Sequence, residues 1–222
     1  MTRMVVSSFY NTLINKEEAI PTSTMLEIDR IRHNNILFVV ITNRLLKDVL
    51  YYNNDFPFID YIICLNGSII YDVNNNKIIY EKSIDKKTIN NIKEQYKNNK
   101  ITYYTKDNYY NELINEDIYK IEIEVNKKDL NKNNSIFRYN NKYYIEINST
   151  SIYDSLKVIM KKENIKQEEI TTIIGNLSEK ELINKIDNTY VVSNSMKELK
   201  ELANNKTKSN DKKGLEQVIK TI

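Results

Sequence analysis

The 222-residue chain is poor in residues that many kinds of functional site require: it has 3 glycines, 2 prolines, 1 cysteine, 1 histidine and no tryptophan. A loop that cradles phosphate needs clustered glycines so that the backbone can approach the ligand closely, and Gly67, Gly175 and Gly214 are far apart in the chain. With Cys64 alone, no intrachain disulfide can form. These shortages exclude a glycine-rich nucleotide loop and a disulfide-stapled fold.

Long hydrophobic runs and an excess of one charge are also missing. No apolar stretch reaches the length that crosses a bilayer, and the amino terminus lacks the pattern of a signal peptide. We therefore expect a cytoplasmic protein with no membrane partner. The net charge is only +3, and the lysines are interleaved with acidic residues. This pattern favours a solvated mixed-charge surface over a nucleic-acid partner.

What is present first indicates an α/β core. Val5 and Val6 lead into a short polar turn, and Met25, Ile28 and Ile31 recur at helical spacing. Two nearly continuous apolar runs, 36–41 and 61–65, are typical of strands buried on both faces of a parallel sheet. Strands and helices in this alternation predict a doubly wound, mostly parallel α/β sheet.

From about residue 74 the pattern changes to that of an α+β insert. We expect strands at 78–80, 118–125 and 143–147 and a lysine-rich helix over 85–99. Within 118–125 apolar residues alternate with Lys120, Glu122 and Glu124, which predicts a sheet with one solvated face. The α/β pattern then returns: helices at 152–164, 178–186, 195–203 and 214–221, strands at 171–174 and 190–192, and a loop at 204–211. The sequence thus predicts a core domain of residues 1–73 and 149–222 and a cap domain of residues 74–148.

Several segments resemble, in order along the chain, the motifs of the Cof-type, sugar-phosphatase-like branch of the haloacid dehalogenase (HAD) superfamily. They are 5–13, 38–44, 60–68, 173–180, 191–203, and Asn210 with Gly214. Thr12 and Leu13 match the end of the first motif, and Asn66 with Gly67 matches the Asn-Gly of another. The resemblance implies a HAD-like core with an inserted cap above the active site.

The same alignment implies that the catalytic positions are degenerate. Family phosphatases use an aspartate nucleophile and, two residues later, an aspartate that protonates the leaving group. Those positions hold Ser8 and Tyr10. Ile152 stands where the family has a lysine, and Asn176 and Lys180 replace two aspartates of the fourth motif. No expected ligand of the family's Mg²⁺ carries charge, so the resemblance implies no metal and no other cofactor.

Three interpretations follow. The first is a pseudophosphatase that binds a small phosphorylated ligand or a protein partner, with a residual anion site made of Thr12, Thr42, Arg44 and Lys180. The second is a divergent, active phosphohydrolase on small phosphorylated metabolites, such as sugar phosphates, that recruits Glu179, Asp107 or Glu112. The third is a scaffolding protein whose cap interface is Tyr103, Tyr104, Tyr109 and Tyr110, although the 17 tyrosines also fit an AT-rich coding bias.

Two further residues with reactive side chains are not expected to take part. His33 is predicted to lie on the surface at a helix C-terminus, where its charge suits the helix dipole. Cys64 is predicted to be a small hydrophobic residue within a buried strand.

Overall fold

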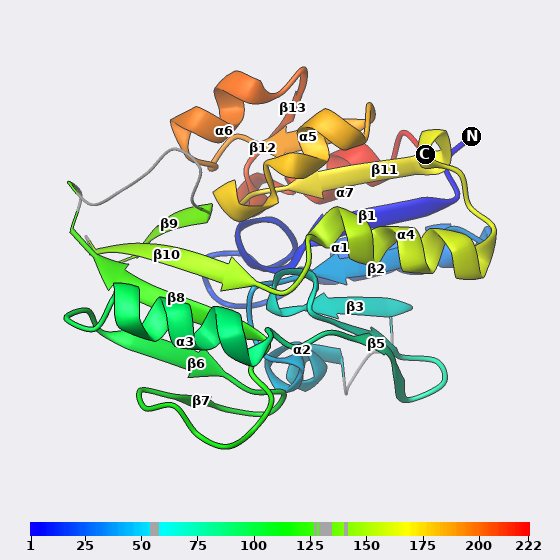
Figure 1. Ribbon diagram of the computed structural model, residues 1–222. Coiled ribbons are helices and arrows are strands. Elements are labelled where there is room, and N and C mark those ends of the chain that lie inside the picture. Colours follow the sequence, from blue (N-terminus) through cyan, green and yellow to red (C-terminus); the bar gives the residue numbers. More distant parts are fainter. Residues whose placement is uncertain (54–57, 127, 129–134, 140–141) are drawn as a thin grey trace.

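The protein folds around an eight-stranded sheet with a smaller five-stranded sheet beside it (Figure 1). The computed structural model describes residues 1–53, 58–126, 128, 135–139 and 142–222. The large sheet has the order β13-β12-β11-β1-β2-β3-β4-β5, and it is parallel from β13 to β3. Its strands are β1 (Met4–Ser8), β2 (Leu37–Ile41), β3 (Tyr61–Cys64), β4 (Ile69–Asp72), β5 (Lys77–Glu81), β11 (Ile170–Ile174), β12 (Thr189–Val192) and β13 (Asn205–Thr207).

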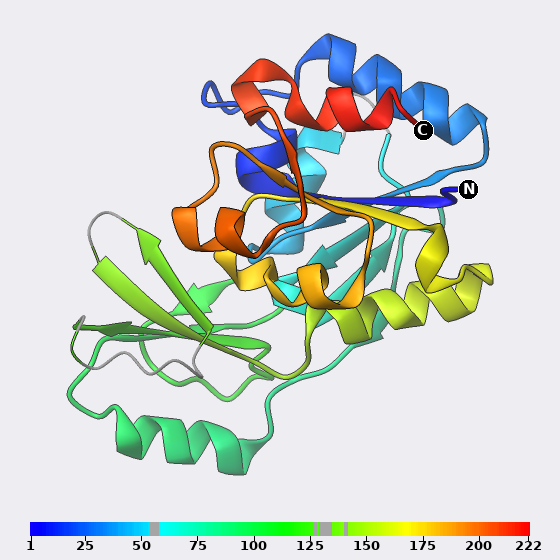
Figure 2. The same ribbon diagram turned by 90° about the horizontal axis from the view of Figure 1, so that it is seen from above.

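Helices cover both faces of this sheet, as the view from above shows (Figure 2). One layer consists of α1 (Thr22–His33), α2 (Leu46–Asn53) and α7 (Gly214–Ile219), and the other of α4 (Ile152–Glu163), α5 (Glu181–Lys185) and α6 (Lys197–Leu202). Successive residues of β1 point into different layers: Val5 packs with Ile28 and Ile31, whereas Val6 packs with Leu156 and Ile159. This alternation explains why the central strands are apolar at every position.

The smaller sheet is antiparallel, with the order β7-β6-β8-β10-β9. Its strands are β6 (Ile101–Tyr104), β7 (Tyr109–Tyr110), β8 (Lys120–Val125), β9 (Ser135–Tyr139) and β10 (Lys142–Asn148). Helix α3 (Lys86–Gln95) packs Ile89 and Ile92 against one face of this sheet. The unit lies beside the carboxyl ends of the parallel strands, where the large sheet carries its connecting turns (Figure 1).

The expected α/β class and the α+β insert are confirmed, and two local predictions are wrong. Strand 78–80, expected in the insert, is β5 and pairs with β4 of the large sheet, so the two sheets divide after Glu81 rather than at residue 74. The expected loop 204–211 contains β13, a short edge strand beside β12. Part of the expected insert, residues 127, 129–134 and 140–141, lies outside the described residues.

One negative finding concerns membranes. Among the described residues, the helices are too short or too polar for any of them to span a bilayer.

Candidate functional site

The candidate site forms where β1 and β11 end side by side. The backbone leaves β1 at Ser8 and turns through Phe9–Leu13, with Asn11 at φ 62°. The left-handed region favours glycine, but asparagine tolerates it better than other residues, which explains how Asn11 stands where the family motif has glycine. β11 ends at Ile174, and Gly175 and Asn176 follow directly. Because β1 and β11 are parallel neighbours, these two turns meet at one edge of the sheet.

Ser8 and Glu179 are joined directly in this site. The Ser8 hydroxyl donates a hydrogen bond to Glu179 Oε2 at 2.5 Å, and the Gly175 amide donates to Ser8 Oγ at 2.9 Å. Both side chains are buried, with Ser8 at 0% and Glu179 at 2% exposure. A carboxylate therefore lies against the position of the family's nucleophile, but it comes from the turn after β11 instead of from β1.

Four donors converge on the Glu179 carboxylate. Besides Ser8, the amides of Asn176 (3.1 Å) and Gly175 (3.3 Å) donate to Oε2, and Asn176 Nδ2 donates to Oε1 at 2.9 Å. Burial raises the pKa of the Glu179 carboxyl to about 7, although the hydrogen bonds from Asn176, Ser8 and Gly175 act in the opposite direction. The group therefore titrates near neutral pH and can hold a proton.

Asparagines connect this centre to neighbouring loops. Asn11 Nδ2 donates to Asn176 Oδ1 at 2.9 Å, and Asn194 Nδ2 donates to the Asn11 carbonyl, also at 2.9 Å. The Asn210 amide donates to Asn194 Oδ1, and its side chain donates to the Ile14 carbonyl at 2.8 Å. These side-chain amides tie the turn after β1 to the neighbouring loops, and one of them, Asn176, stands at the position of a family aspartate.

Tyr10, which replaces the family's acid/base aspartate, is a half-buried aromatic residue of the site's rim. The Arg44 guanidinium lies over its ring, 4.2 Å from the centroid, and the Phe9 ring meets it edge-on at 5.0 Å. Burial raises the pKa of the Tyr10 phenol, and Arg44 partly opposes this effect. The phenol is therefore protonated at neutral pH and cannot act there as an anionic base.

The other expected anion-binding residues do not converge around one exposed centre. Thr12 and Thr42 are buried, and the Thr42 hydroxyl accepts from the Arg44 amide at 3.2 Å. Lys180 is exposed, and in the described part of the chain no hydrogen bond joins its side chain to the other three. Ile152 is a buried residue of the apolar cluster at the start of α4. An anion site that includes both Arg44 and Lys180 therefore stays a prediction.

The donors present do not fit the Mg²⁺ that the fold family implies. Among the residues that the structure describes, Glu179 supplies the carboxylate hydrogen-bonded to Ser8, and both of its oxygens already accept hydrogen bonds. Among the described residues, three acidic, histidine or cysteine side chains do not gather anywhere in a metal-binding group. Because Mg²⁺ is held through carboxylates, we assign it no ligand set and no chemical step in this site.

A second polar cluster joins the small sheet to the large one, and the sequence did not predict it. Lys120 was expected on a solvated face, but it is 1% exposed and donates to the Asn43 carbonyl at 2.7 Å and to Glu122 at 2.6 Å. Glu146, 4% exposed, lies 3.8 Å from Lys120 and accepts from Asn43 Nδ2 at 3.5 Å. The polar face of β8 is therefore buried against the core domain near this cluster.

The remaining candidate residues lie away from Ser8. Asp107 and Glu112 are exposed, and within the described chain neither makes a contact with the Ser8–Glu179 centre. Of the four cap tyrosines, Tyr103 is buried, and Tyr104 lies beneath Lys120 and donates to Glu122. These two side chains are engaged within the protein and are not displayed for the expected interface.

The predictions for the histidine and the cysteine are confirmed. His33 is exposed at the end of α1, and Cys64 is fully buried in β3, where burial raises its thiol pKa.

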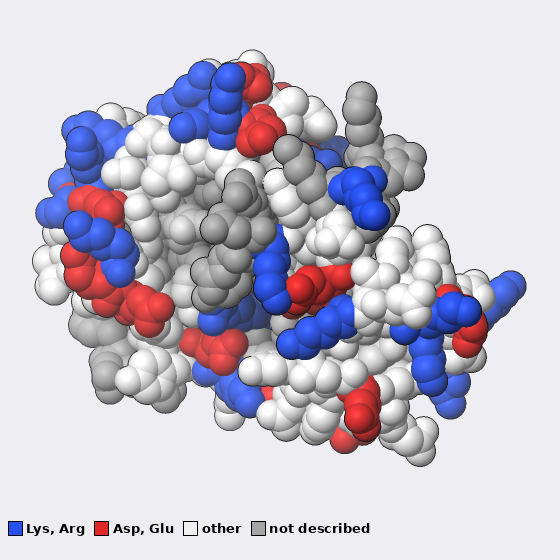
Figure 3. Space-filling model, turned by 90° about the vertical axis from the view of Figure 1, so that its left-hand side faces the viewer, with Lys and Arg blue, Asp and Glu red and all other residues white. Residues whose placement is uncertain are grey.

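The surface at the carboxyl ends of the parallel strands is neither mainly positive nor mainly negative. Figure 3 shows Lys and Arg side chains lying next to Asp and Glu side chains over its described part. This intermixing agrees with the mixed-charge surface expected from the sequence.

Comparison with known proteins assigns the family. A family model described as haloacid dehalogenase-like hydrolase matches residues 10–152. Comparison with curated proteins gives no match. The fold is similar to that of a haloacid dehalogenase-like hydrolase from B. subtilis, with a TM-score of 0.86, 17% identity and 100% of both chains covered.

Two structures from Bacteroides thetaiotaomicron are also similar. One is BT1666, described among phosphatases of the HAD superfamily (TM-score 0.83, 15% identity, 100% of this chain and 95% of that chain). The other is a haloacid dehalogenase-like hydrolase (TM-score 0.76, 16% identity, 100% and 99% covered). At these identities the likeness establishes the fold, and the family-model match extends over more than half of the chain. The chain therefore belongs to the haloacid dehalogenase-like hydrolase family.

Proposed function

We propose that this protein is a pseudophosphatase: a HAD-fold protein that has lost aspartyl-phosphate chemistry and acts by binding a ligand or a protein partner. The observation that carries the proposal is the buried Ser8–Glu179 pair. Glu179 has its oxygens occupied by hydrogen bonds and its pKa raised to about 7, so it offers neither a free nucleophile nor a free metal ligand.

The binding role would involve the rim of the site rather than its centre. Arg44 is exposed and lies over Tyr10, so its guanidinium can still reach an anion in solvent. Because Ser8 and Glu179 are buried, a phosphorylated ligand would contact this rim before it met any buried carboxylate. Its binding would need no Mg²⁺.

The test combines turnover with binding. Phosphate release from p-nitrophenyl phosphate and a panel of sugar phosphates, with and without Mg²⁺, should stay at the rate of the buffer. Calorimetry with the same sugar phosphates should show saturable binding that Arg44→Gln weakens. Flat traces at millimolar ligand would remove the small-ligand role, and co-purification of a protein would then be the remaining support for binding.

A second function is favoured by the same pair of residues. Glu179 could take the Ser8 proton as Ser8 Oγ attacks phosphorus, with Tyr10 giving a proton to the departing oxygen. Against this, Ser8 is inaccessible, and the Gly175 amide also donates to its oxygen. Metal-independent turnover abolished by both Ser8→Ala and Glu179→Gln would establish this second function and refute the first.

A further inference from the structure

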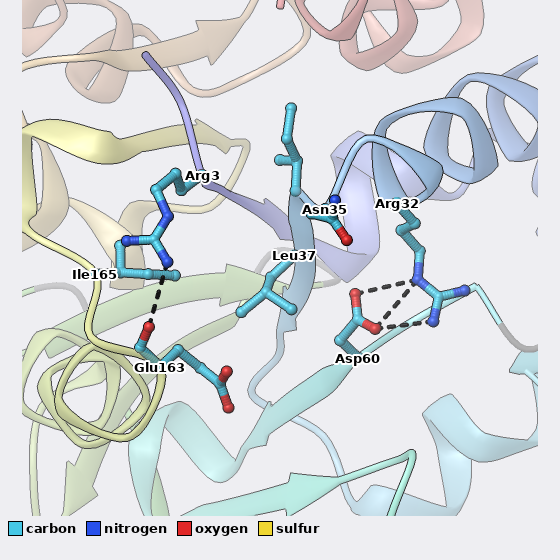
Figure 4. Close-up of a pocket in the computed structure, with 8 residues that line it drawn as sticks. Arg3, Arg32, Asn35, Leu37, Asp60, Glu163 and Ile165 are labelled. Atoms are coloured by element: carbon cyan, nitrogen blue, oxygen red, sulfur yellow. Dashed lines mark hydrogen bonds and ion pairs between the residues drawn. The ribbon is translucent and has the colours of Figure 1, made fainter.

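A cavity of about 300 Å³ lies at the opposite edge of the large sheet, at the amino ends of β1, β2 and β3. Ser8 lies at the far end of β1 (Met4–Ser8), five positions after Arg3, or roughly 17 Å along an extended strand. The cavity is therefore separate from the site described above. Figure 4 shows Arg3 and Glu163 on one side of Leu37 and the Arg32–Asp60 ion pair on the other.

One wall is an ion pair that is already satisfied. Arg32 at the end of α1 donates to both oxygens of Asp60, with contacts of 2.8 to 3.2 Å. Asp60 is buried and also accepts from the Phe38 amide at 2.8 Å and from Asn74 Nδ2 at 3.2 Å. We assign this wall a structural role, because both carboxylate oxygens of Asp60 already accept hydrogen bonds.

On the opposite wall the charges of Arg3 and Glu163 are paired with Glu169 and Lys162, but each side chain keeps one polar atom without a partner among the described residues. Arg3 uses its Nη atoms on the carbonyls of Asn164 (2.8 Å) and Glu163 (3.5 Å) and on Glu169, while its Nε–H has no acceptor among the described residues. Glu163 accepts from Tyr61 and Lys162 through Oε1, and no donor in the described chain reaches its Oε2. Arg3 is half exposed, so a molecule in solvent can reach it.

Between the walls the lining is apolar. Leu37 lies between the two walls (Figure 4), and Ile36 and Ile165, which are 8% and 6% exposed, complete the apolar part. At the rim, the Asn35 side chain makes no hydrogen bond with the described residues and is exposed. The cavity therefore combines a guanidinium, a carboxylate, an amide and an aliphatic surface.

From this combination we infer that the cavity binds a free α-amino acid with an aliphatic side chain. The amino acid's carboxylate pairs with Arg3, its ammonium group with Glu163 Oε2, and its side chain lies against Leu37. Charge-assisted hydrogen bonds of this kind are the strong ones, and the zwitterion would pair with the free Nε–H of Arg3 and the free Oε2 of Glu163 while adding no net charge. The volume is at the lower end of that of ligand pockets, about 300–1,000 Å³, which suits a ligand of this size.

Calorimetry with leucine, isoleucine and valine at millimolar concentration tests the inference. At least one of them should bind saturably. Leucinamide, which lacks the carboxylate, and 4-methylpentanoic acid, which lacks the ammonium group, should each bind at least ~10-fold more weakly. Absence of saturable heat, or equal binding of these analogues, would overturn the assignment.

Protein variants then assign the contacts. Arg3→Gln and Glu163→Gln should each weaken binding by ~10-fold or more. Lys161→Gln and Glu168→Gln change exposed charges outside the lining and should leave binding unchanged. Circular dichroism checks that each variant is folded. If Arg3→Gln does not fold, Glu163→Gln and the analogue series still test the inference. Equal loss in the control variants would contradict the inference.

Discussion

The Ser8 hydroxyl donates a 2.5 Å hydrogen bond to the Glu179 carboxylate, across 171 positions of sequence. The family's first motif has a carboxylate on β1 at the position of Ser8, and this chain instead has a carboxylate that reaches the same place from the turn after β11. The carboxyl group beside Ser8 is therefore buried and comes from a different segment of the chain. Because its oxygens accept hydrogen bonds from Ser8, Gly175 and Asn176, the carboxylate serves to hold two turns together.

The Glu179 carboxyl should make stability depend on pH in a defined window. Its pKa is about 7 in the folded protein against an ordinary value of 4.5, so between these values the folded state holds a proton that the unfolded state has lost. The stabilisation is complete below pH 4.5 and is lost as pH rises to 7. Urea unfolding should show wild-type stability falling relative to Glu179→Gln by on the order of 3 kcal/mol over this window. Parallel curves would contradict the assignment, and the exposed Glu198→Gln is the control.

Ser8→Ala should destabilise the protein, because it removes buried hydrogen bonds. The substitution removes a donor to Glu179 and the closest acceptor of the Gly175 amide, all in a buried place. A loss of about 1–3 kcal/mol in the free energy of unfolding is expected. Ser178→Ala is the matched control, since Ser178 has no side-chain hydrogen bond in the described residues, and it should change stability by less than about 0.5 kcal/mol.

Lys120→Met should be among the most destabilising substitutions in the small sheet. It leaves the buried Glu146 and the nearby Glu122 without their cation, and removing one partner of a buried pair costs about 3–5 kcal/mol. Lys142→Met removes an exposed pair with Glu124 from the same sheet and should cost less than about 1 kcal/mol. Denaturant unfolding measures both, and equal effects would show that the Lys120 cluster is not buried.

Gly67→Ala should disrupt the junction between β3 and α4. Gly67 has φ +109°, and an added Cβ would lie 2.6 Å from the Ser151 carbonyl oxygen. Strain and collision act together, so a loss of at least about 2 kcal/mol is expected. Glu18→Gly is the opposite substitution, at an exposed residue with φ 56°. Because glycine tolerates this φ, the free energy of unfolding should change by less than about 1 kcal/mol. A Gly67→Ala variant as stable as wild type would refute this account.

Much of the fold could be predicted because its signals are local. The continuous apolar runs of β2 and β3 and the helical spacing of Ile28 and Ile31 reflect burial that each segment requires by itself. Strand 77–81 was misplaced for the same reason. Its three apolar residues, Ile78, Ile79 and Tyr80, are consecutive and half-buried, and only the pairing with β4 puts the strand in the large sheet.

The sequence could predict which catalytic residues the site lacks, but not which side chains contact one another there. The loss of aspartates at positions 8, 10 and 176 is what the resemblance to the family motifs implies. Glu179 and Lys180 are neighbours in sequence, and the sequence offered no means of choosing which of them points toward Ser8. The turn Leu177–Glu179 makes that choice by burying Glu179 and exposing Lys180.

The sequence by itself determined the α/β architecture, the inserted unit and the absence of the family's carboxylates at positions 8, 10 and 176. Only the tertiary structure decided that Glu179 meets Ser8, and that Lys120 and Glu146 are buried between the two sheets. The physical reason is that hydrophobic periodicity describes one segment at a time. A polar side chain's burial depends on the surface that a distant segment places against it, and for Lys120 that surface is the Asn43 carbonyl, 77 residues away.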